Sequence, residues 1–407
     1  MDWEMLAKDL AVSNDAKIVL LVLDGMGGLP VDGKTELETA RTPNLDALAA
    51  RGACGLTIPV LPGITPGSGP AHLSLFGYDP LRHQLGRGIL EALGSGVEVG
   101  PNDLVARGNF ATFKAGLVTD RRAGRLATEI NARICRGINA AFASSKGAKA
   151  PLEGVDIRLF PGKEHRFVAR FSGEGLDDRL SDADPQKEGK PRVPAKPLVP
   201  EAERAAAVVN RFMDWVTDLL KDEPVANTIL VRGFSKFPTI PSMSDLYRIR
   251  PAAVANYPMY KGLARLLGMS VLDAGAETSS LFDALEKHFR DFDFFYIHYK
   301  KTDSAGEDGN FAAKVAAIEE IDAFLPRLSA LGPDVLVITS DHSTPALLKG
   351  HSWHPNPFCL VSKYALPDAV TRFSERDCGR GILGCFPALQ AMPLMLAHGL
   401  KLKKYGA

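Results

Sequence analysis

Short, continuously apolar segments that alternate with helical stretches are the feature that most constrains the fold of this chain. The first is Lys17–Leu23 (KIVLLVL), which ends at the Asp24-Gly25 pair. An apolar run of this length, rich in β-branched residues, is typical of a strand buried on both faces. Further strands are expected at Phe292–His298, Asp334–Thr339 and Phe358–Val361. Helices are expected before and after the first of these, at Ser279–Arg290 and Asn310–Leu331. Another helix is expected near the N-terminus at Pro43–Arg51, with Thr42 as its cap. The alternation predicts an α/β fold in which helices flank a mostly parallel sheet.

The middle of the chain has a different pattern. Arg107–Phe113 and Gly116–Thr119 predict a β-hairpin, and His165–Phe171 (HRFVARF) alternates as a half-exposed strand does. Ser172–Pro200 follows, rich in Gly, Asp, Lys and Pro. A structureless stretch of this length is usually a functional loop, a lid or a linker. We therefore expect a smaller α+β domain, residues 96–250, inserted between two parts of the larger domain, residues 1–95 and 251–407.

Charge and cysteine content exclude several classes of protein. The 407 residues include 48 basic and 48 acidic side chains, so no bulk electrostatic field favours nucleic acid or an anionic membrane, although local basic clusters can bind small anions. The five cysteines are scattered and form no C-x-x-C pair, which argues against a disulfide framework or a thiolate zinc site. We expect a cytoplasmic protein, because the first residues do not resemble a signal peptide and no apolar run is long enough for a membrane span.

Polar side chains that ligate hard divalent ions follow several of the predicted strands. Asp24 comes directly after the first strand, Asp341 follows the strand at 334–339, and Asp303 lies just beyond another. In an open α/β sheet, ligands bind at the carboxyl ends of the strands. Seven candidate ligands suffice for two ions: Asp24, Asp303, Glu307, Asp341, His342, His351 and His354. A single Asp after a strand is more often a turn residue or a helix cap than a ligand, so the prediction rests on the whole set.

Ser68 lies in the segment Pro62–Ser74 (PGITPGSGPAHLS), where Gly and Pro predict a tight loop and an apolar stretch begins at Ala71. We expect an exposed serine near a helix N-terminus, where the helix dipole favours negative charge. A metal ion beside it would lower the pKa of the hydroxyl and make the serine a nucleophile. A helix-capping serine in a proline-rich turn is the alternative interpretation.

Basic residues form a third group. Arg107 is followed by three arginines in the segment Asp120–Arg125 (DRRAGR). Guanidinium groups suit bidentate recognition of carboxylate and phosphate, although a solvated charged turn would have the same composition. Lys300 and Lys301, next to Asp303, could place a cation beside the metal ligands.

These segments, in order along nearly the whole chain, resemble the archaeal-type cofactor-independent phosphoglycerate mutases of the alkaline phosphatase superfamily. The matching segments are VLDGMGG (Val22–Gly28), ARTPNLDALAARG (Ala40–Gly52), PGITPGSGPAHLSLFGYDP (Pro62–Pro80), GRG (Gly86–Gly88), RGNFAT (Arg107–Thr112), DRRAGR (Asp120–Arg125), KTDSAGEDG (Lys301–Gly309), TSDHSTP (Thr339–Pro345), HSWHPNPF (His351–Phe358) and FSERDCGRG (Phe373–Gly381). The resemblance implies an alkaline-phosphatase-like sheet flanked by helices, and an inserted domain whose arginines hold the carboxylate and phosphate of the substrate.

The resemblance also implies a division of ligands between two divalent ions. One ion is held by Asp24, Ser68, Asp341 and His342, and the other by Asp303, the residue at 307, and His351. Ser68 is then the nucleophile that becomes phosphoserine. The expected substrate-binding residues are Arg107, Arg121, Arg122, Arg125 and Lys300.

Two positions depart from the family pattern. Glu307 stands where the family usually has His, and His354 stands where it usually has Asp or Asn. A carboxylate makes the site harder and more anionic, so we expect Mn²⁺, with Mg²⁺, Co²⁺ and Zn²⁺ as alternatives. His354 lies close to His351 in the sequence and is expected as an extra ligand or as part of the pocket wall.

The function implied by the resemblance is an intramolecular phosphotransferase that interconverts 3-phosphoglycerate and 2-phosphoglycerate without bisphosphoglycerate. Water competes as an acceptor, so the inserted domain would have to exclude it. If the site is open, the same residues predict a metal-dependent phosphomonoesterase or phosphotransferase for another small phosphorylated acid. If Glu307 marks a degraded site, a non-catalytic phosphometabolite binder is expected. A kinase that uses ATP as donor is a further alternative, but the sequence contains no Gly-rich phosphate loop to support it. The expected partner is a small phosphorylated hydroxy acid, with no nucleic acid and no membrane.

Overall fold

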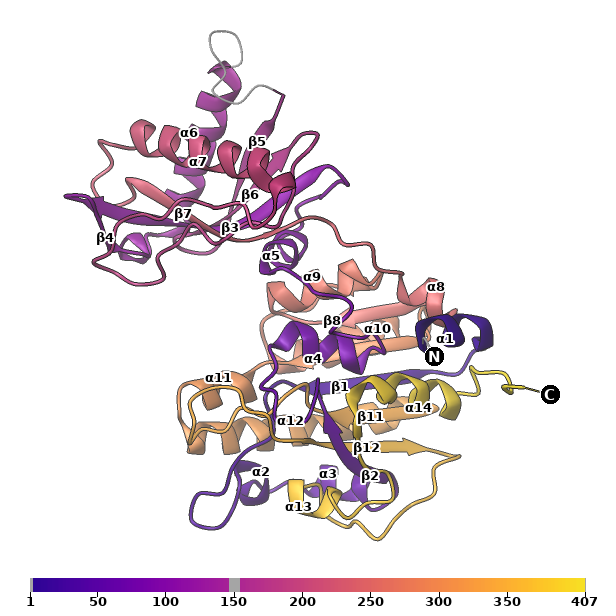
Figure 1. The fold of residues 1–407 in the computed structure, drawn as a ribbon. Coiled ribbons are helices and arrows are strands. Elements are labelled where there is room, and N and C mark those ends of the chain that lie inside the picture. Colours follow the sequence, from indigo (N-terminus) through magenta and orange to yellow (C-terminus); the bar gives the residue numbers. More distant parts are fainter. Residues whose placement is uncertain (1–2, 146–153, 407) are drawn as a thin grey trace. The chain divides into compact units, whose positions relative to one another are not determined.

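The computed structural model describes residues 3–145 and 154–406, and the chain divides into two compact units (Figure 1). Unit 1 comprises Met1–Gln84 and Ile240–Ala407, and unit 2 comprises Leu85–Thr239. Unit 2 therefore begins at 85 instead of the expected 96, and ends at 239 instead of 250. The physical reason at its start is helix α5 (Arg87–Gly94), which packs against strands of unit 2.

Unit 1 contains an eight-stranded sheet in the order β13-β2-β12-β11-β1-β10-β8-β9. Its strands are β1 (Ile18–Leu23), β2 (Ala53–Ile58), β8 (Pro251–Val254), β9 (Ser270–Leu272), β10 (Phe294–Tyr299), β11 (Val335–Thr339), β12 (Asn356–Ser362) and β13 (Gly384–Pro387). Its helices are α1 (Trp3–Leu10), α2 (Glu36–Thr39), α3 (Pro43–Ala49), α4 (Ser68–Leu75), α8 (Met243–Tyr247), α9 (Pro258–Leu266), α10 (Thr278–His288), α11 (Lys301–Glu307), α12 (Phe311–Leu331), α13 (Glu375–Cys378), η3 (Ala388–Gln390) and α14 (Ala391–His398).

The strand predicted at Lys17–Leu23 is β1, and all six of its residues are buried. It lies between β10 and β11 and is parallel to both, with Leu23 opposite Tyr299 and Val22 opposite Thr339. β8 and β9 extend the parallel part, whereas β12 is antiparallel to β11 and β2. The predicted mostly parallel sheet flanked by helices is confirmed. Because β1, β10 and β11 are parallel and in register, the residues that follow them lie side by side at one edge.

Helices cover both faces of this sheet (Figure 1). Side chains of α3, α10 and α12 share one apolar core with alternate residues of β1, and α14 packs against β11 and α4 on the other face. Thr42 occupies the N-cap position of α3 and Pro43 its first position, as expected, but the Thr42 side chain makes no capping hydrogen bond. Asp322 of α12 instead accepts the backbone N–H of Leu45 at 2.7 Å and the side-chain amide of Asn44 at 2.9 Å. A carboxylate from α12 thus caps α3 and fixes the two helices to each other.

Unit 2 contains a five-stranded antiparallel sheet. Its elements are α5, β3 (Asp103–Lys114), β4 (Leu117–Asp120), η1 (Ala123–Arg125), α6 (Thr128–Ser145), β5 (Asp156–Pro161), β6 (Arg166–Ser172), η2 (Pro200–Ala202), α7 (Glu203–Leu219) and β7 (Thr228–Ser235). The long strand β3 pairs with β4, β6 and β7, so the predicted hairpin is confirmed. Helices α6 and α7 share an apolar core with the sheet. Across both units, every helix within residues 3–145 and 154–406 is too short or too polar to cross a bilayer.

The stretch expected to be structureless, Ser172–Pro200, is tied to the sheet of unit 2 by backbone hydrogen bonds. The N–H of Ala183 donates to the carbonyl of Val231 at 2.8 Å, and the N–H of Val118 donates to that of Lys190 at 2.8 Å. A further backbone bridge joins Leu180 to Pro197 within the stretch itself. The segment therefore presents its side chains at fixed positions beside β4 and β7.

Gly108, in the middle of β3, lies opposite Phe167 of β6, and the ring of Phe167 packs over the position where a Cβ would be. We predict that Gly108→Ala lowers the free energy of unfolding by about 1–3 kcal/mol, because the added methyl overpacks a buried ring. Gly137→Ala is the matched control: this glycine is exposed in α6 with no atom within 4 Å of an added Cβ. It should raise stability by about 0.5–1 kcal/mol. Urea unfolding monitored by circular dichroism checks both, and a Gly108→Ala protein as stable as the wild type would contradict the prediction.

Candidate functional site

The carboxyl ends of β1, β10 and β11 bring three aspartates of unit 1 together. Asp24 follows β1, Asp341 lies just beyond β11, and Asp303 is in α11, directly after β10. All three side chains are buried, with exposed fractions of 0–1%. Buried carboxylates repel one another unless hydrogen-bond donors or cations compensate, so this cluster requires positive partners.

Two overlapping groups of possible metal ligands lie at this edge of the sheet. Asp24, Asp341 and His342 form the first group, and Asp303, His342 and His351 form the second; the ligand atoms of each group lie within 4.8 Å of one another. Ser68 Oγ lies 3.0 Å from His342 Nε2, so the serine adjoins the first group. The structure therefore brings together most of the ligands predicted from sequence, with His342 common to both groups.

Two buried carboxylate oxygens of this cluster receive no hydrogen bond from the described residues, although His342 Nε2 lies 3.4 Å from Asp24 Oδ1 and 3.1 Å from Asp341 Oδ2. The other oxygen of Asp24, Oδ2, accepts hydrogen bonds from Tyr260, from His298 at 2.9 Å and from Lys300 at 3.1 Å. One oxygen is thus saturated by donors and the other is left for a ligand, which fits a bound divalent ion.

The charges of these side chains suit the same role. Burial would raise the pKa of Asp24, but the hydrogen bond from His298 and the positive charge of Lys300 hold that pKa well below its usual value. Burial and the neighbouring Asp24 would raise the pKa of Asp341, yet His342 and His72 lower it overall. Burial lowers the pKa of His342 and so favours its neutral, ligating form.

His351 connects the second group to the serine loop. Its Nδ1 donates to the carbonyl of Pro66 at 2.9 Å, so Nε2 is the nitrogen left to ligate an ion, and it lies 3.5 Å from Asp303 Oδ1. Its ring stacks on that of His342 with 3.6 Å between the centroids. A hydrogen bond that fixes the tautomer in this way is characteristic of a metal-binding histidine.

Ser68 is the first residue of α4, with Gly67 at the N-cap, and it is half-buried instead of exposed. His72, one turn further along, donates from Nδ1 to the carbonyl of Ser68 at 2.8 Å and lies 3.2 Å from Asp341 Oδ2. The start of α4 is therefore fastened to the aspartate cluster. Sequence reasoning missed His72, although its i,i+4 spacing from Ser68 on a predicted helix was a signal.

Two predicted ligands lie outside both groups. Glu307 is 55% exposed, and its Oε1 is 3.9 Å from His351 Nε2. Burial of its carboxyl, followed by the charge of Asp303, raises the pKa of Glu307. His354 hydrogen-bonds to Ser352 Oγ at 3.0 Å and stacks on Trp353. Glu307 is near enough to approach the second group by rotation of its side chain, whereas His354 is engaged elsewhere.

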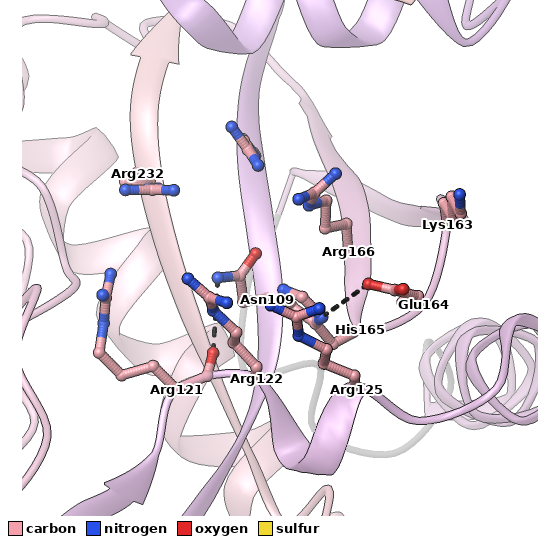
Figure 2. A pocket seen from close by; sticks show the side chains of 10 residues that line it. Asn109, Arg121, Arg122, Arg125, Lys163, Glu164, His165, Arg166 and Arg232 are labelled. Atoms are coloured by element: carbon pink, nitrogen blue, oxygen red, sulfur yellow. Dashed lines mark hydrogen bonds and ion pairs between the residues drawn. The ribbon is translucent and has the colours of Figure 1, made fainter. Parts of the chain in front are cut away.

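Unit 2 contains a separate, strongly basic cavity of about 470 Å³ (Figure 2). It is lined by Arg107, Asn109, Arg121, Arg122, Arg125, Lys163, Glu164, His165, Arg166 and Arg232. All four predicted arginines lie here, whereas Lys300 lies in unit 1 beside Asp24 and Asp303. Sequence reasoning missed the residues that β6, β7 and the turn before β6 contribute, because their spacing along the chain does not connect them to Arg107.

The turn after β4 presents three of these arginines. The carboxylate of Asp120 accepts the N–H of Arg122 at 2.7 Å and that of Gly124 at 2.6 Å. Ala123, Gly124 and Arg125 all have positive φ, so the chain reverses sharply. A backbone held in this conformation by a side chain fixes the directions of the arginines that it carries.

Two further groups define the chemistry of the cavity. Asp184, from the tied segment Ser172–Pro200, accepts hydrogen bonds from Arg121 Nε at 2.9 Å and Nη2 at 2.6 Å, which holds that guanidinium in place. His165 is buried among the arginines, and burial together with the charge of Arg166 lowers its pKa to about 4. A neutral imidazole thus lies in a cavity whose other nitrogen groups are mostly cationic.

Comparisons of this chain with a family model, with known sequences and with solved structures agree on one family. The family model described as 2,3-bisphosphoglycerate-independent phosphoglycerate mutase matches residues 49–226. A Thermotoga neapolitana protein named "Probable 2,3-bisphosphoglycerate-independent phosphoglycerate mutase" is 52% identical over 407 residues, covering 100% of both chains. The solved structure of a cofactor-independent phosphoglycerate mutase from Thermoplasma acidophilum is similar, with a TM-score of 0.72 and 30% identity, covering 94% of this chain and 100% of that one. A Pyrococcus horikoshii structure matches with a TM-score of 0.81 and 28% identity, covering 97% and 100%. The chain belongs to the family of 2,3-bisphosphoglycerate-independent phosphoglycerate mutases.

Proposed function

We propose that this protein interconverts 3-phosphoglycerate and 2-phosphoglycerate through a phosphoserine at Ser68, using two divalent ions and no bisphosphoglycerate. The observation that carries the proposal is the position of Ser68 at the start of α4: its Oγ lies 3.0 Å from His342 Nε2, and the same nitrogen lies 3.4 Å from Asp24 Oδ1 and 3.1 Å from Asp341 Oδ2. The names of its full-length relatives support the choice of substrate.

In this proposal, Asp24, Ser68, Asp341 and His342 hold one ion, and Asp303, His351 and Glu307 hold the other. When bound, the ions would lower the pKa of the serine hydroxyl and neutralise the oxygens of the phosphoryl group. Carboxylate oxygens predominate among these ligands, so we propose Mn²⁺ as the ion, with Mg²⁺, Co²⁺ or Zn²⁺ as substitutes.

Residues of the chain orient the nucleophile. Ser68 Oγ lies 3.0 Å from His342 Nε2, so both side chains face the same proposed ion, and the positive end of α4 favours negative charge on Ser68 Oγ. Ser68 Oγ attacks the phosphorus of 3-phosphoglycerate, and the bond from phosphorus to the C3 oxygen breaks. The C2 hydroxyl of the retained glycerate then attacks phosphoserine, which restores Ser68 and yields 2-phosphoglycerate.

We further propose that the basic cavity of unit 2 recognises the anionic groups of the substrate. Its guanidinium groups can pair bidentately with carboxylate or phosphate oxygens, and Asp184 fixes one of them in advance. Holding glycerate by its carboxylate keeps it from exchanging with water between the two transfers, which is what separates a mutase from a phosphatase. Unit 2 is thus assigned the substrate-clamping role.

The decisive assay supplies 3-phosphoglycerate and Mn²⁺ to the purified protein without bisphosphoglycerate. We predict that 2-phosphoglycerate forms with little free phosphate, measured by ³¹P NMR. Ser68→Ala is the paired variant: it should keep less than about 1% of the turnover, because loss of a covalent nucleophile costs more than a hundredfold. Free phosphate without isomerisation would favour a phosphatase, and no turnover with any of the four ions would rule out both enzymes.

Glu307→His tests the assignment of the second ion. Replacing carboxylate by imidazole makes the ligand set softer, so activity should shift from Mn²⁺ towards Zn²⁺ or Co²⁺. The comparison is of turnover with each ion in turn, wild type against variant. His354→Asn is the control and should leave the order of preference as it is. An unchanged order in Glu307→His would remove Glu307 from the ligand set.

The pKa of His165 tests whether the basic cavity of unit 2 binds the substrate. In the free protein its imidazole should titrate at about 4, because burial and neighbouring arginines disfavour the charged form. A bound anion favours that form, so 3-phosphoglycerate should raise this pKa. Histidine ¹H–¹³C NMR with His165→Gln to assign the signal measures both values. A midpoint near the ordinary value of 6.5 that the substrate does not move would contradict the prediction.

A further inference from the structure

Lys314, in α12, is a completely buried lysine that the proposed reaction does not use. Its exposed fraction is 0%, and its Nζ donates to the carbonyl of Gly27 at 2.9 Å and to that of Thr344 at 2.8 Å. Burying an ammonium group is costly, because it loses its hydration. A neutral apolar side chain would fill the same space without that cost. The presence of a lysine here therefore needs an explanation, and its two hydrogen bonds to backbone carbonyls suggest one.

Two carboxylates accompany the buried ammonium. Glu36 Oε1 lies 3.8 Å from Lys314 Nζ and accepts the N–H of Ala346 at 2.8 Å. Glu375 accepts the N–H of Gly28 at 2.9 Å and the hydroxyl of Thr35 at 2.8 Å. Burial lowers the pKa of Lys314 to about 8, and both glutamates oppose that shift. The network therefore fastens two separate stretches of backbone, 27–28 and 344–346.

Asp24 lies just before the first of these stretches, and Asp341 and His342 lie just before the second. Gly27 lies in the turn that follows Asp24, and the N–H of Thr344 donates to the Gly27 carbonyl at 3.0 Å. The hydroxyl of Thr344 donates to Asp303 Oδ1 at 2.6 Å and lies 3.1 Å from His342 Nδ1. An added Cβ at Gly27 would overlap Ser343, so only glycine permits this approach of the two turns.

Electrostatic repulsion between the aspartates favours separation of these turns. With no ion between them, Asp24, Asp303 and Asp341 are like charges in a region of low dielectric constant, and their repulsion pushes the turns apart. The hydrogen bonds from Lys314 oppose that movement, because one ammonium group contacts both backbones.

We propose that Lys314 is a positioning residue that braces the turns after β1 and β11, so that the ligands of unit 1 are in place before a metal ion binds. The inference rests on the proposed metal site. It assigns to Lys314, Glu36 and Glu375 a role that no sequence motif indicated.

The test is Lys314→Met, which removes the ammonium and keeps the length of the side chain. Without added metal, hydrogen–deuterium exchange should become faster in peptides that cover 24–28 and 341–346. Affinity for Mn²⁺, measured by calorimetric titration of the metal-free protein, should fall about 10–100-fold, the usual effect of losing a group that orients metal ligands. No substrate is present in either measurement, so the result does not depend on mutase activity.

Lys401→Met is the matched control. Lys401 is also 0% exposed and donates to the carbonyl of Asn14 at 2.8 Å, away from the aspartates. It should lose stability without losing affinity for Mn²⁺. If Lys314→Met does not fold, Lys314→Met/Glu36→Gln removes the opposite charge as well and keeps an acceptor for Ala346. Unchanged exchange or unchanged affinity in the folded variant, or an equal loss in Lys401→Met, would overturn the proposal. Wild-type protein that binds no Mn²⁺ would overturn the proposed metal site and this inference together.

Discussion

Repulsion among three buried carboxylates is the constraint on which the structure of unit 1 depends. Asp24, Asp303 and Asp341 lie at one edge of the sheet because three parallel strands end there in register. Like charges removed from water cannot remain close without compensation. The chain supplies part of it with His72, His298 and Lys300, while two of the carboxylate oxygens accept no hydrogen bond from the described residues. That incomplete compensation is what distinguishes a binding centre from an ordinary buried ion-pair network.

The two candidate sites differ in charge: three buried aspartates gather at the one in unit 1, and arginines line the one in unit 2. An acidic centre binds a phosphate only with cations between them, whereas a basic cavity binds the same anion directly. Both sites are also prepared in advance. The hydrogen bond from His351 to Pro66 fixes a ligand tautomer, and Asp184 fixes the guanidinium of Arg121. Groups that are already in position lose less entropy when the ligand binds, which favours affinity and correct geometry.

Local pattern predicted several of the strands and helices, and the polar residues that follow them, because these signals are short in range. Apolar runs placed β1, β10 and β11, and residues after parallel strands must share an edge, which placed Asp24 and Asp341. The missed residues depend on contacts between distant segments. Tyr260 and His298 meet at Asp24 only after folding, and nothing in the sequence distinguishes Lys314 from a solvated lysine of a helix. Thr42 was correctly placed at the N-cap of α3, but the acceptor that caps the helix was missed for the same reason, since it comes from another helix.

The central claim is that two ions are held by the predicted aspartates and histidines beside Ser68. Anomalous diffraction from crystals soaked in Mn²⁺ measures this directly, because it locates each ion without reference to activity. We predict two separate peaks, one contacting Asp24, Asp341 and His342 and the other contacting Asp303 and His351. A single peak, or peaks away from these side chains, would contradict the account.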